Sequence, residues 1–296
     1  MTKHFFIGVD GGATKCIVRM EDEAGHVIGQ ASHGSANIRF SVEQAWQSIH
    51  AAIVSILQKQ NMRLEDPHVQ FHAGMGLAGC EVVSAYQAFL HHAHYSSLFH
   101  TLKVISDAHI ACVGAHGGRD GAIIIAGTGV VGWQIQAHQT TQVGGNGFPH
   151  DDDGGGAWLG LQAVKITFQW LDGRMPASML ATAIFDYFHG DQQHFIDWAN
   201  QANSAAFAAL APIVIVAAKA GDVVAIHLLQ QAADTMHRIH LALIAKTKNK
   251  KSLPIALGGS IAPLLEPYLH PTLRTHLCAA QFAPEMGVIL WIKNNL

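Results

Sequence analysis

Charged residues are scarce in this sequence, and so are the features of a membrane, secreted or nucleic-acid-binding protein. Only 13% of the residues are charged, and the formal net charge of −3 provides no basic surface for nucleic acid or an anionic membrane. No apolar run of about 18 residues occurs, so we expect no membrane span. The first residues enter an apolar segment with no basic region before it, which predicts no signal peptide.

Cysteine is also sparse, and its spacing excludes the common metal and redox motifs. The four cysteines are scattered without any Cys-x-x-Cys pair: Cys16, Cys80, Cys112 and Cys278. Free thiols in a cytoplasmic protein are therefore expected. Histidine is abundant, with 21 residues, and His91, His92 and His94 cluster. Because no cysteine or carboxylate stands beside them at ligand spacing, we interpret them as surface histidines rather than a metal site.

The stretch 7–17 is the most informative part of the sequence. Apolar segments at 4–9 and 16–20 flank a short glycine-rich link, which predicts two antiparallel strands joined as a hairpin. No helix follows the glycines, as a dinucleotide-binding turn would require. The Gly-Lys-Ser/Thr ending of a P-loop is also missing.

The residues of this link suit phosphate binding. Gly11 and Gly12 let backbone N–H groups approach a phosphate, while Thr14 and Lys15 add a hydroxyl and a positive charge. Asp10, at the end of the strand, is placed to hold Mg²⁺ directly or through water. An ordinary hairpin turn containing Asp and Gly remains the alternative interpretation.

The first part of the chain has the pattern of an α/β domain. We expect a third strand at 26–32, a helix at 41–60, a strand at 69–77 and a helix that runs to about residue 94. A strand at 102–106 ends at Asp107, and a helix at 108–115 follows. Ligands collect at the strand ends of such a domain.

The pattern then restarts. Two strands, 121–126 and 130–137, flank the turn Gly127-Thr128-Gly129, which indicates a duplicated α/β domain with a cleft between the copies. A glycine-rich loop covers 144–160. Helical patterns follow at 157–171, 178–189, 192–199, 204–220 and 222–248.

The end of the chain contains a strand at 253–257, the turn Gly258-Gly259-Ser260 and a final helix opened by Pro284. We therefore expect an N-terminal domain at 1–116, on which the final helix 284–296 packs. The C-terminal domain is expected at 117–283, with a helical insertion.

Six motifs together resemble the BadF/BadG/BcrA/BcrD ATPase family of the actin–hexokinase–Hsp70 superfamily, and within it the glucosamine and N-acetylglucosamine kinases. The motifs are Val9 to Lys15, Gly34-Ser35-Ala36-Asn37, Ser106-Asp107, Ile125 to Gly129, Asp152 to Gly160, and Leu257-Gly258-Gly259-Ser260. The resemblance covers essentially the whole chain. It implies an α/β fold of duplicated ribonuclease-H-like (actin/hexokinase-type) domains with an interdomain cleft.

The resemblance also implies roles for individual residues. The nucleotide would be bound by Gly11, Gly12, Thr14 and Lys15 in the first phosphate hairpin, by Gly127, Thr128 and Gly129 in the second, and by Gly258, Gly259 and Ser260 at the adenosine. The sugar would be bound by Asn37, Asp107, Gly145, Asn146 and Asp152. Asp107 would also be the catalytic base, and Asp10 the magnesium ligand.

The residue types leave alternatives open at three of these positions. Asp107 precedes a predicted helix and is equally suited to cap it, and Asp152 has the same alternative. Asn37 fits an ordinary turn.

Relatives often carry an aromatic-Gly pair where Asn146-Gly147 stands here, and many carry Asp-Glu-Gly-Ser at residues 152–155, where this chain has Asp-Asp-Gly-Gly. These departures leave the sugar selectivity open.

The expected function is an ATP-dependent, Mg²⁺-requiring kinase that phosphorylates the 6-hydroxyl of glucosamine or N-acetylglucosamine. Its partners would be the amino sugar and ATP, without nucleic acid or membrane, and a homodimer is an alternative to a monomer. Two other functions are weighed: an activator ATPase that couples ATP hydrolysis to electron transfer through a cysteine-bound iron–sulfur cluster, and a non-catalytic sugar sensor. The scattered cysteines disfavour the first, and Asp10, Asp107 and both phosphate turns disfavour the second.

Overall fold

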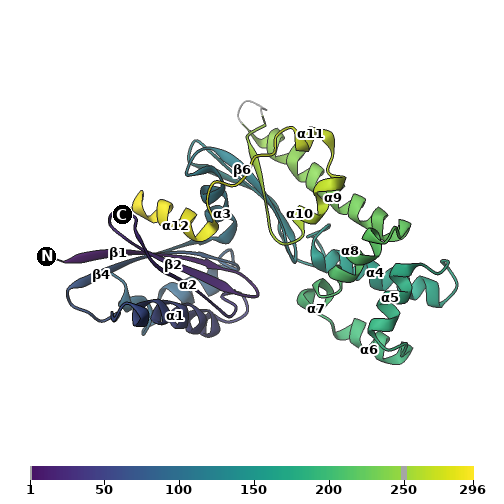
Figure 1. Cartoon of the computed structure of the whole chain (residues 1–296), viewed down its shortest axis with the longest axis horizontal. Coiled ribbons are helices and arrows are strands. Elements are labelled where there is room, and N and C mark those ends of the chain that lie inside the picture. The colour runs from purple at the N-terminus through teal and green to yellow at the C-terminus, as the bar shows by residue number, and fades with distance from the viewer. Residues whose placement is uncertain (1, 248–251) are drawn as a thin grey trace. The chain divides into compact units, whose positions relative to one another are not determined.

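The chain forms two compact units. The computed structural model describes residues 2–247 and 252–296. Unit 1 combines the chain up to Gly121 with the C-terminal segment Ala279–Leu296, and unit 2 is Ala122–Cys278. Each unit contains one β-sheet with its own hydrophobic core (Figure 1).

Unit 1 begins with the predicted hairpin and continues as an α/β domain. Its elements are β1 (Lys3–Gly11), β2 (Cys16–Asp22), β3 (Val27–His33), α1 (Val42–Lys59), β4 (Val69–Leu77), α2 (Val83–Leu90), the 3₁₀ turn η1 (Ser96–Leu98), β5 (Thr101–Ser106), α3 (Asp107–His116) and α12 (Pro284–Lys293). The strand order is β3-β2-β1-β4-β5, with β4 parallel to both β1 and β5. The carboxyl ends of β1, β4 and β5 therefore meet at one edge of the sheet.

The C-terminal helix α12 packs on the sheet of unit 1 (Figure 1). Gly8 of β1 makes this possible, because a Cβ atom there would lie 2.1 Å from the backbone oxygen of Glu285. Val288 and Ile292 of α12 pack closely on β4 at Gly74. Since both side chains are fully buried, the last helix belongs to the core of the first unit.

Unit 2 repeats the opening pattern and then adds helices. Its elements are β6 (Gly121–Ala126), β7 (Val130–Gln136), β8 (Gln139–Gly144), α4 (Gly156–Leu171), α5 (Met179–Tyr187), α6 (Gln192–Gln201), α7 (Ser204–Ala208), α8 (Ala211–Lys219), α9 (Val223–Lys246), β9 (Ile255–Gly258), α10 (Ala262–Leu265), the 3₁₀ turn η2 (Glu266–Tyr268) and α11 (Pro271–Arg274). The strand order is β8-β7-β6-β9, with β9 parallel to β6. This order matches β3-β2-β1-β4 of unit 1, so the predicted duplicated α/β architecture is confirmed.

The strand β8 is absent from the sequence prediction. It pairs antiparallel with β7 through a two-residue turn at Ala137 and His138, whose φ angles are 49° and 62°. Left-handed angles at both positions are typical of a type I′ turn, which normally carries Asn or Gly. Alanine and histidine give no such signal, so the hairpin could not be predicted from its turn.

Two predicted helices differ from the helices in the structure. The helix expected to reach about residue 94 ends at Leu90. The helix expected at 204–220 is divided into α7 and α8, and Pro212 stands in the first turn of α8. Proline suits a helix start because it has no N–H to donate. The last residue of the helix predicted at 222–248 lies outside the described residues.

Among the described residues, no individual helix combines the length and apolarity needed to cross a membrane. The segments Ser204–Lys219 and Val223–Lys246 meet that criterion only together, as a pair bent by 117°.

Candidate functional site

The hairpin turn of unit 1 presents an exposed backbone that its neighbours hold in place. The amide of Gly12 donates to the carbonyl of Lys15 at 2.9 Å and closes the turn. The carbonyls of Gly11 and Gly12 accept from the amides of Ala78 (2.8 Å) and Ala36 (3.1 Å). The turn is thus braced by the segments after β4 and β3, while the side chains of Thr14 and Lys15 face solvent.

Asp10 is the last side chain of β1 before this turn. Burial raises the pKa of Asp10 to about 7, and the carboxylates of Asp107 and Glu285 add to the shift, while Lys15 opposes it. Glu285 is itself 6% exposed and accepts from Gln30 at 3.0 Å. Acidic side chains from β1, α3 and α12 therefore share a desolvated region with one nearby lysine.

Asp107 is the first residue of α3, directly after β5. Ser106, rather than Asp107, is the N-cap, and its hydroxyl accepts from the amide of Ala108 at 3.2 Å. The Oδ1 of Asp107 accepts from the same amide at 2.8 Å. The hydroxyl of Ser106 also donates to the Oδ1 of Asp107 at 3.3 Å. Burial raises the pKa of Asp107, and the carboxylate of Glu81 adds to the shift, although the hydrogen bonds from Ala108 and Ser106 act in the opposite direction. The capping role is filled by its neighbour, and a raised pKa suits a proton acceptor working near neutral pH.

Asn37 lies in the loop that braces the hairpin turn. Its Oδ1 accepts from the amide of Arg39 at 3.0 Å, so the turn role expected as an alternative is present. The amide of Ile38 donates to the carbonyl of Ala78, just beyond the end of β4. Leu77, the last residue of β4, pairs with Ser106 of β5. Asn37 therefore belongs to the same sheet edge as Asp10 and Asp107.

The turn of unit 2 is built in the same way and is packed against the start of α4. The amide of Gly127 donates to the carbonyl of Gly129 at 2.9 Å. The carbonyls of Gly127 and Thr128 accept from the amides of Gly156 (2.8 Å) and Ala157 (3.0 Å). A Cβ atom at Gly155 would lie 2.6 Å from the oxygen of Thr128. The glycine at 155 therefore allows the helix to meet the turn closely.

The turn after β9 packs on the end of β6. Gly259 has φ +83°, and a Cβ atom there would lie 2.2 Å from the carbonyl oxygen of Ala126. The same oxygen accepts from the amide of Ile261 at 2.9 Å. Residues 258–260 and the turn 127–129 are therefore neighbours at one edge of this sheet.

Asp152 faces the turn of unit 2. Its Oδ1 accepts from the amide of Val130 at 3.3 Å, and Gly129 is in close contact with the carboxylate. The N-cap of α4 is Gly155, without a side-chain cap. Asp152 thus does not cap this helix as the alternative interpretation proposed. The backbone of Asp152 has a left-handed φ of +69°.

Asn146 is fixed by Asp151, a residue that sequence reasoning does not single out. The backbone amide and the Nδ2 of Asn146 donate to the Oδ2 of Asp151 at 3.0 and 2.7 Å. Burial acts to raise the pKa of Asp151, but the hydrogen bonds from Asn146 outweigh it and lower the pKa below its ordinary value. A cavity of 460 Å³ adjoins this pair and reaches Thr235 and Arg238 of α9. No local pattern in the sequence indicates that α9 lies beside this loop.

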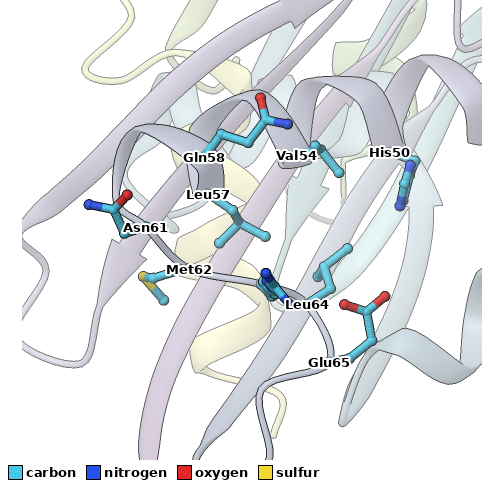
Figure 2. Close-up of a pocket in the computed structure, with 9 residues that line it drawn as sticks. His50, Val54, Leu57, Gln58, Asn61, Met62, Leu64 and Glu65 are labelled. Carbon is cyan, nitrogen blue, oxygen red and sulfur yellow. The ribbon is translucent and has the colours of Figure 1, made fainter.

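A larger cavity of 590 Å³ lies in unit 1, away from these residues (Figure 2). Helix α1 lines one side and the segment that leads to β4 lines the other, with side chains including His50, Val54, Gln58, Asn61, Met62 and Glu65. This segment joins the sheet where β4 begins, whereas Asp10 and Asp107 lie where the strands end. None of the candidate residues lines this cavity, so size alone does not identify the site.

The structure groups the candidate residues by unit. In unit 1, Asp10, the turn 11–15, Asn37 and Asp107 share one sheet edge. In unit 2, the turn 127–129, Gly145 and Asn146, Asp152 and residues 258–260 surround the start of α4 and the carboxyl end of β6. Within the described ranges, no group of three or more His, Cys, Asp or Glu side chains is arranged to hold a metal ion.

The four cysteines do not form a cluster, although Cys16 and Cys80 lie near Asp10 and Asp107 in unit 1. Cys16 and Cys112 are buried in unit 1, and Cys278 lies after α11. Cys80 is close to Asp107, and burial together with the charges of Asp107 and Glu81 raises the pKa of its thiol to about 12. Such a thiol is a poor nucleophile and a poor metal ligand.

The chain is similar to known proteins over nearly its whole length. A model of the BadF/BadG/BcrA/BcrD ATPase family matches residues 7–291. The glucosamine kinase of Vibrio cholerae is 32% identical over 288 residues, covering 97% of this chain and 95% of that protein. A solved structure from Chromobacterium violaceum, assigned as an N-acetylglucosamine kinase, has 31% identity and a TM-score of 0.89, covering 97% of this chain and 98% of that one.

A solved structure with much lower sequence identity is compared for its fold alone. A ROK family glucokinase from Streptomyces griseus, in complex with glucose and AMPPNP, has 16% identity and a TM-score of 0.52, covering 98% of each chain. The two-sheet architecture therefore occurs in structures with little sequence similarity to this one.

Proposed function

Because the chain belongs to the BadF/BadG/BcrA/BcrD ATPase family, we propose that it is an ATP-dependent kinase acting on the 6-hydroxyl of glucosamine or N-acetylglucosamine. The observation that carries the proposal is Asp107. It is a partly buried carboxylate with a raised pKa, it lies beside Asp10, and it stands at the sheet edge of a braced, exposed glycine turn. The similarity to a glucosamine kinase supports the choice of substrate.

Asp107 acts as the general base. Its carboxylate takes the proton of the 6-hydroxyl while the sugar oxygen forms a bond to the γ-phosphorus and the bond to the ADP oxygen breaks. A base held by burial and by the amide of Ala108 needs little reorganisation as the reaction proceeds. The same carboxylate aligns the hydroxyl for in-line attack.

The two turns bind the nucleotide. In this proposal, backbone amides around Gly11, Gly12, Thr14 and Lys15, and around residues 127–129, donate to phosphate oxygens. Residues 258–260 hold the adenosine in this proposal. The brace from Ala78 and Ala36 keeps the first turn in place before the nucleotide binds.

The carboxylates around Asp10 are suited to bind a magnesium ion. Asp10 and Asp107 are partly buried carboxylates whose pKa values are raised mainly by desolvation and further by neighbouring carboxylates. Lys15 opposes the shift at Asp10, and hydrogen bonds from Ala108 and Ser106 oppose it at Asp107. Oxygen ligands are what Mg²⁺ prefers, and one or two carboxylates together with substrate phosphates commonly suffice. Asp10 would hold the ion, which when bound neutralises charge on the phosphates.

In this proposal the residues that bind the sugar are Asn37, Asp107, Gly145, Asn146 and Asp152. An iron–sulfur activator is disfavoured because the four cysteines are dispersed along the chain, without Cys-x-x-Cys spacing. The homodimer and the cytoplasmic location expected from the sequence stay predictions.

The test is coupled ADP release with Mg-ATP against glucosamine, N-acetylglucosamine, N-acetylmannosamine, glucose and no sugar. We expect strong stimulation by an amino sugar, with the product phosphorylated at the 6-position by phosphorus NMR. Hydrolysis that is independent of sugar would instead favour the activator, and nucleotide binding without turnover would favour the sensor.

A further inference from the structure

The first turn of α12 carries a buried acid, Glu285, to the face of the sheet on which Asp10 lies. Gly8 and Asp10 are two residues apart in β1, so they occupy neighbouring positions on one face. A Cβ atom at Gly8 would lie 2.1 Å from the backbone oxygen of Glu285, which shows that the helix touches the strand there. Helix α12 covers this face of the sheet (Figure 1), and Glu285 is 6% exposed. Glu285 therefore lies over the position next to Asp10.

The side chain of Glu285 is oriented by an amide from β3. The Nε2 of Gln30 donates to the Oε1 of Glu285 at 3.0 Å. Gln30 lies in the same row of the sheet as Gly8, since both pair with Arg19 of β2. This hydrogen bond uses one carboxylate oxygen and brings no positive charge, so it fixes the acid without neutralising it.

Glu285 lacks the counter-charge that another buried acid of unit 1 has. Glu21 is 4% exposed and forms ion pairs with the Nε of Arg19 at 2.8 Å and with the Nζ of Lys293 at 3.5 Å. Within residues 2–247 and 252–296, Glu285 forms no ion pair. Because buried charges in proteins are normally paired or bound to a metal, a buried carboxylate without a cation points to an ion from solution.

Asp10 shares this lack of a counter-charge. It has no ion pair in the part of the chain that the structure describes, and Lys15 acts on it only at longer range. The charge of Glu285 reaches Asp10, because it adds to the effects of burial and of Asp107 in raising the pKa of that carboxyl. A divalent cation near both acids would therefore stabilise both.

We propose that Glu285 is a second acid of the divalent-cation site at Asp10, and that it acts on the ion through water. The inference rests on the proposed function and deepens it. The role is indirect because, among the described side chains, no three acids are arranged to hold an ion together. Mg²⁺ in proteins usually keeps several waters, and acids beyond its direct ligands tune its affinity. Gln30 holds Glu285 in position for this role.

Direct titration of a metal ion tests the proposal without any turnover. Mn²⁺ takes the place of Mg²⁺, and the electron paramagnetic resonance signal of the free ion reports its binding to the full chain in the presence of ADP. Glu285→Gln should raise the Kd for Mn²⁺ about 10-fold. In EDTA, the same variant should bind ADP as tightly as the wild type or more tightly, because an acid that repels the phosphates is gone.

Glu21→Gln is the matched control, since it also replaces a buried acid of unit 1 that contacts α12. It should leave the Kd for Mn²⁺ unchanged and lower the midpoint of unfolding in denaturant with EDTA, because Arg19 loses its partner. Glu285→Gln should do the reverse: it should keep the midpoint of the metal-free protein and weaken the binding of Mn²⁺.

Equal Mn²⁺ affinities in the wild type and Glu285→Gln would overturn the proposal, as would a wild-type protein that binds no Mn²⁺ with ADP. A loss of Mn²⁺ affinity matched by an equal loss of metal-free ADP affinity would overturn it too, since that pattern marks a structural role. Failure of the proposed function looks different, because no sugar would then stimulate ADP release. The Mn²⁺ titration contains no sugar, so it gives its answer in either case.

Discussion

At the scale of single residues, the environment of each carboxylate decides what it can do. Asp107 and Ser106 are adjacent, yet the serine caps α3 and the aspartate is left with a raised pKa. Asp151 and Asp152 are also adjacent, but one locks Asn146 and the other faces the turn at Val130. A run of acids in a sequence does not reveal this division of roles.

Replacing Asp107 separates catalysis from binding. Asp107→Asn should reduce kcat about 10²- to 10⁴-fold, because the amide cannot accept the proton, while ATP and sugar still bind. The measurement is coupled ADP release together with calorimetric binding of each ligand.

The neighbouring Ser106→Ala provides the control. It removes the cap of α3, which should cost about 1 kcal/mol of stability, and it also removes the hydrogen bond from the Ser106 hydroxyl to the Oδ1 of Asp107. Because the carboxylate that accepts the proton is kept, turnover should fall far less than in Asp107→Asn. Near-normal turnover in Asp107→Asn would show that another group is the base.

At the scale of secondary-structure elements, the turns both join the strands and contain many of the candidate site residues. The hairpins that begin each unit are visible in the sequence because glycine and threonine interrupt apolar runs. The hairpin between β7 and β8 is not visible, since Ala137 and His138 occupy its left-handed positions. Predicting an element from its turn therefore succeeds only when the turn uses the residues that favour its backbone angles.

The turn at Gly259 should tolerate no side chain. Gly259→Ala should destabilise unit 2 by about 2–5 kcal/mol, because a Cβ atom meets the carbonyl of Ala126 in addition to the strain of a positive φ. It should also weaken ATP binding. Denaturant unfolding and nucleotide titration measure the two effects.

Gly173→Ala is the matched control for backbone strain. Gly173 has φ +81°, close to the +83° of Gly259, but a Cβ atom there would meet nothing within 4 Å. We expect a cost of about 1–2 kcal/mol with nucleotide binding intact. Equal losses in the two variants would mean that the contact with Ala126 is unimportant.

At the scale of the whole molecule, segments distant in sequence complete each unit. Helix α12 closes the core of unit 1, and the segment 270–277 packs its histidines against those of α9 in unit 2. The rings of His237 and His270 stack at 4.0 Å, and those of His240 and His276 lie 5.3 Å apart. His240 is 1% exposed, donates to or accepts from Ser252 at 3.0 Å, and has a buried Nδ1 without a partner among the described residues.

This histidine cluster predicts a loss of stability in acid. Burial and the neighbouring His276 and His237 lower the pKa of His240 to about 4, below its ordinary value of 6.5. Burial and His270 also lower the pKa of His237, against the effect of Asp234. Between pH 6.5 and 4 the unfolded chain binds more protons than the folded one, so the free energy of unfolding falls as the pH falls through this window.

The pH dependence of unfolding in denaturant measures this contribution. His240→Gln should flatten the slope of the unfolding free energy against pH by up to about 1 kcal/mol per pH unit, with allowance for solvent screening. His227→Gln, on the exposed face of the same helix, should leave the slope unchanged. Parallel slopes in the wild type and His240→Gln would exclude the buried histidine as the cause.

The sequence by itself determined the features that depend on local chemistry. Apolar runs interrupted by glycine, threonine and aspartate predicted both opening hairpins, and six ordered motifs identified the family that the family model confirms. Gly173, Gly190 and Gly221 stand just after the helical stretches predicted at 157–171, 178–189 and 204–220, and each has the positive φ that favours glycine at a helix end. These features can be predicted from the sequence because each depends only on residues that are adjacent in the chain.

Only the tertiary structure decided the rest. It placed α9 beside the loop of Asn146, assigned the cap of α3 to Ser106, and brought Glu285 from the far end of the chain to Asp10. These outcomes depend on burial and on charges contributed by distant segments. A pKa or a cavity is a property of the surroundings that folding assembles, and no local pattern of residues encodes it.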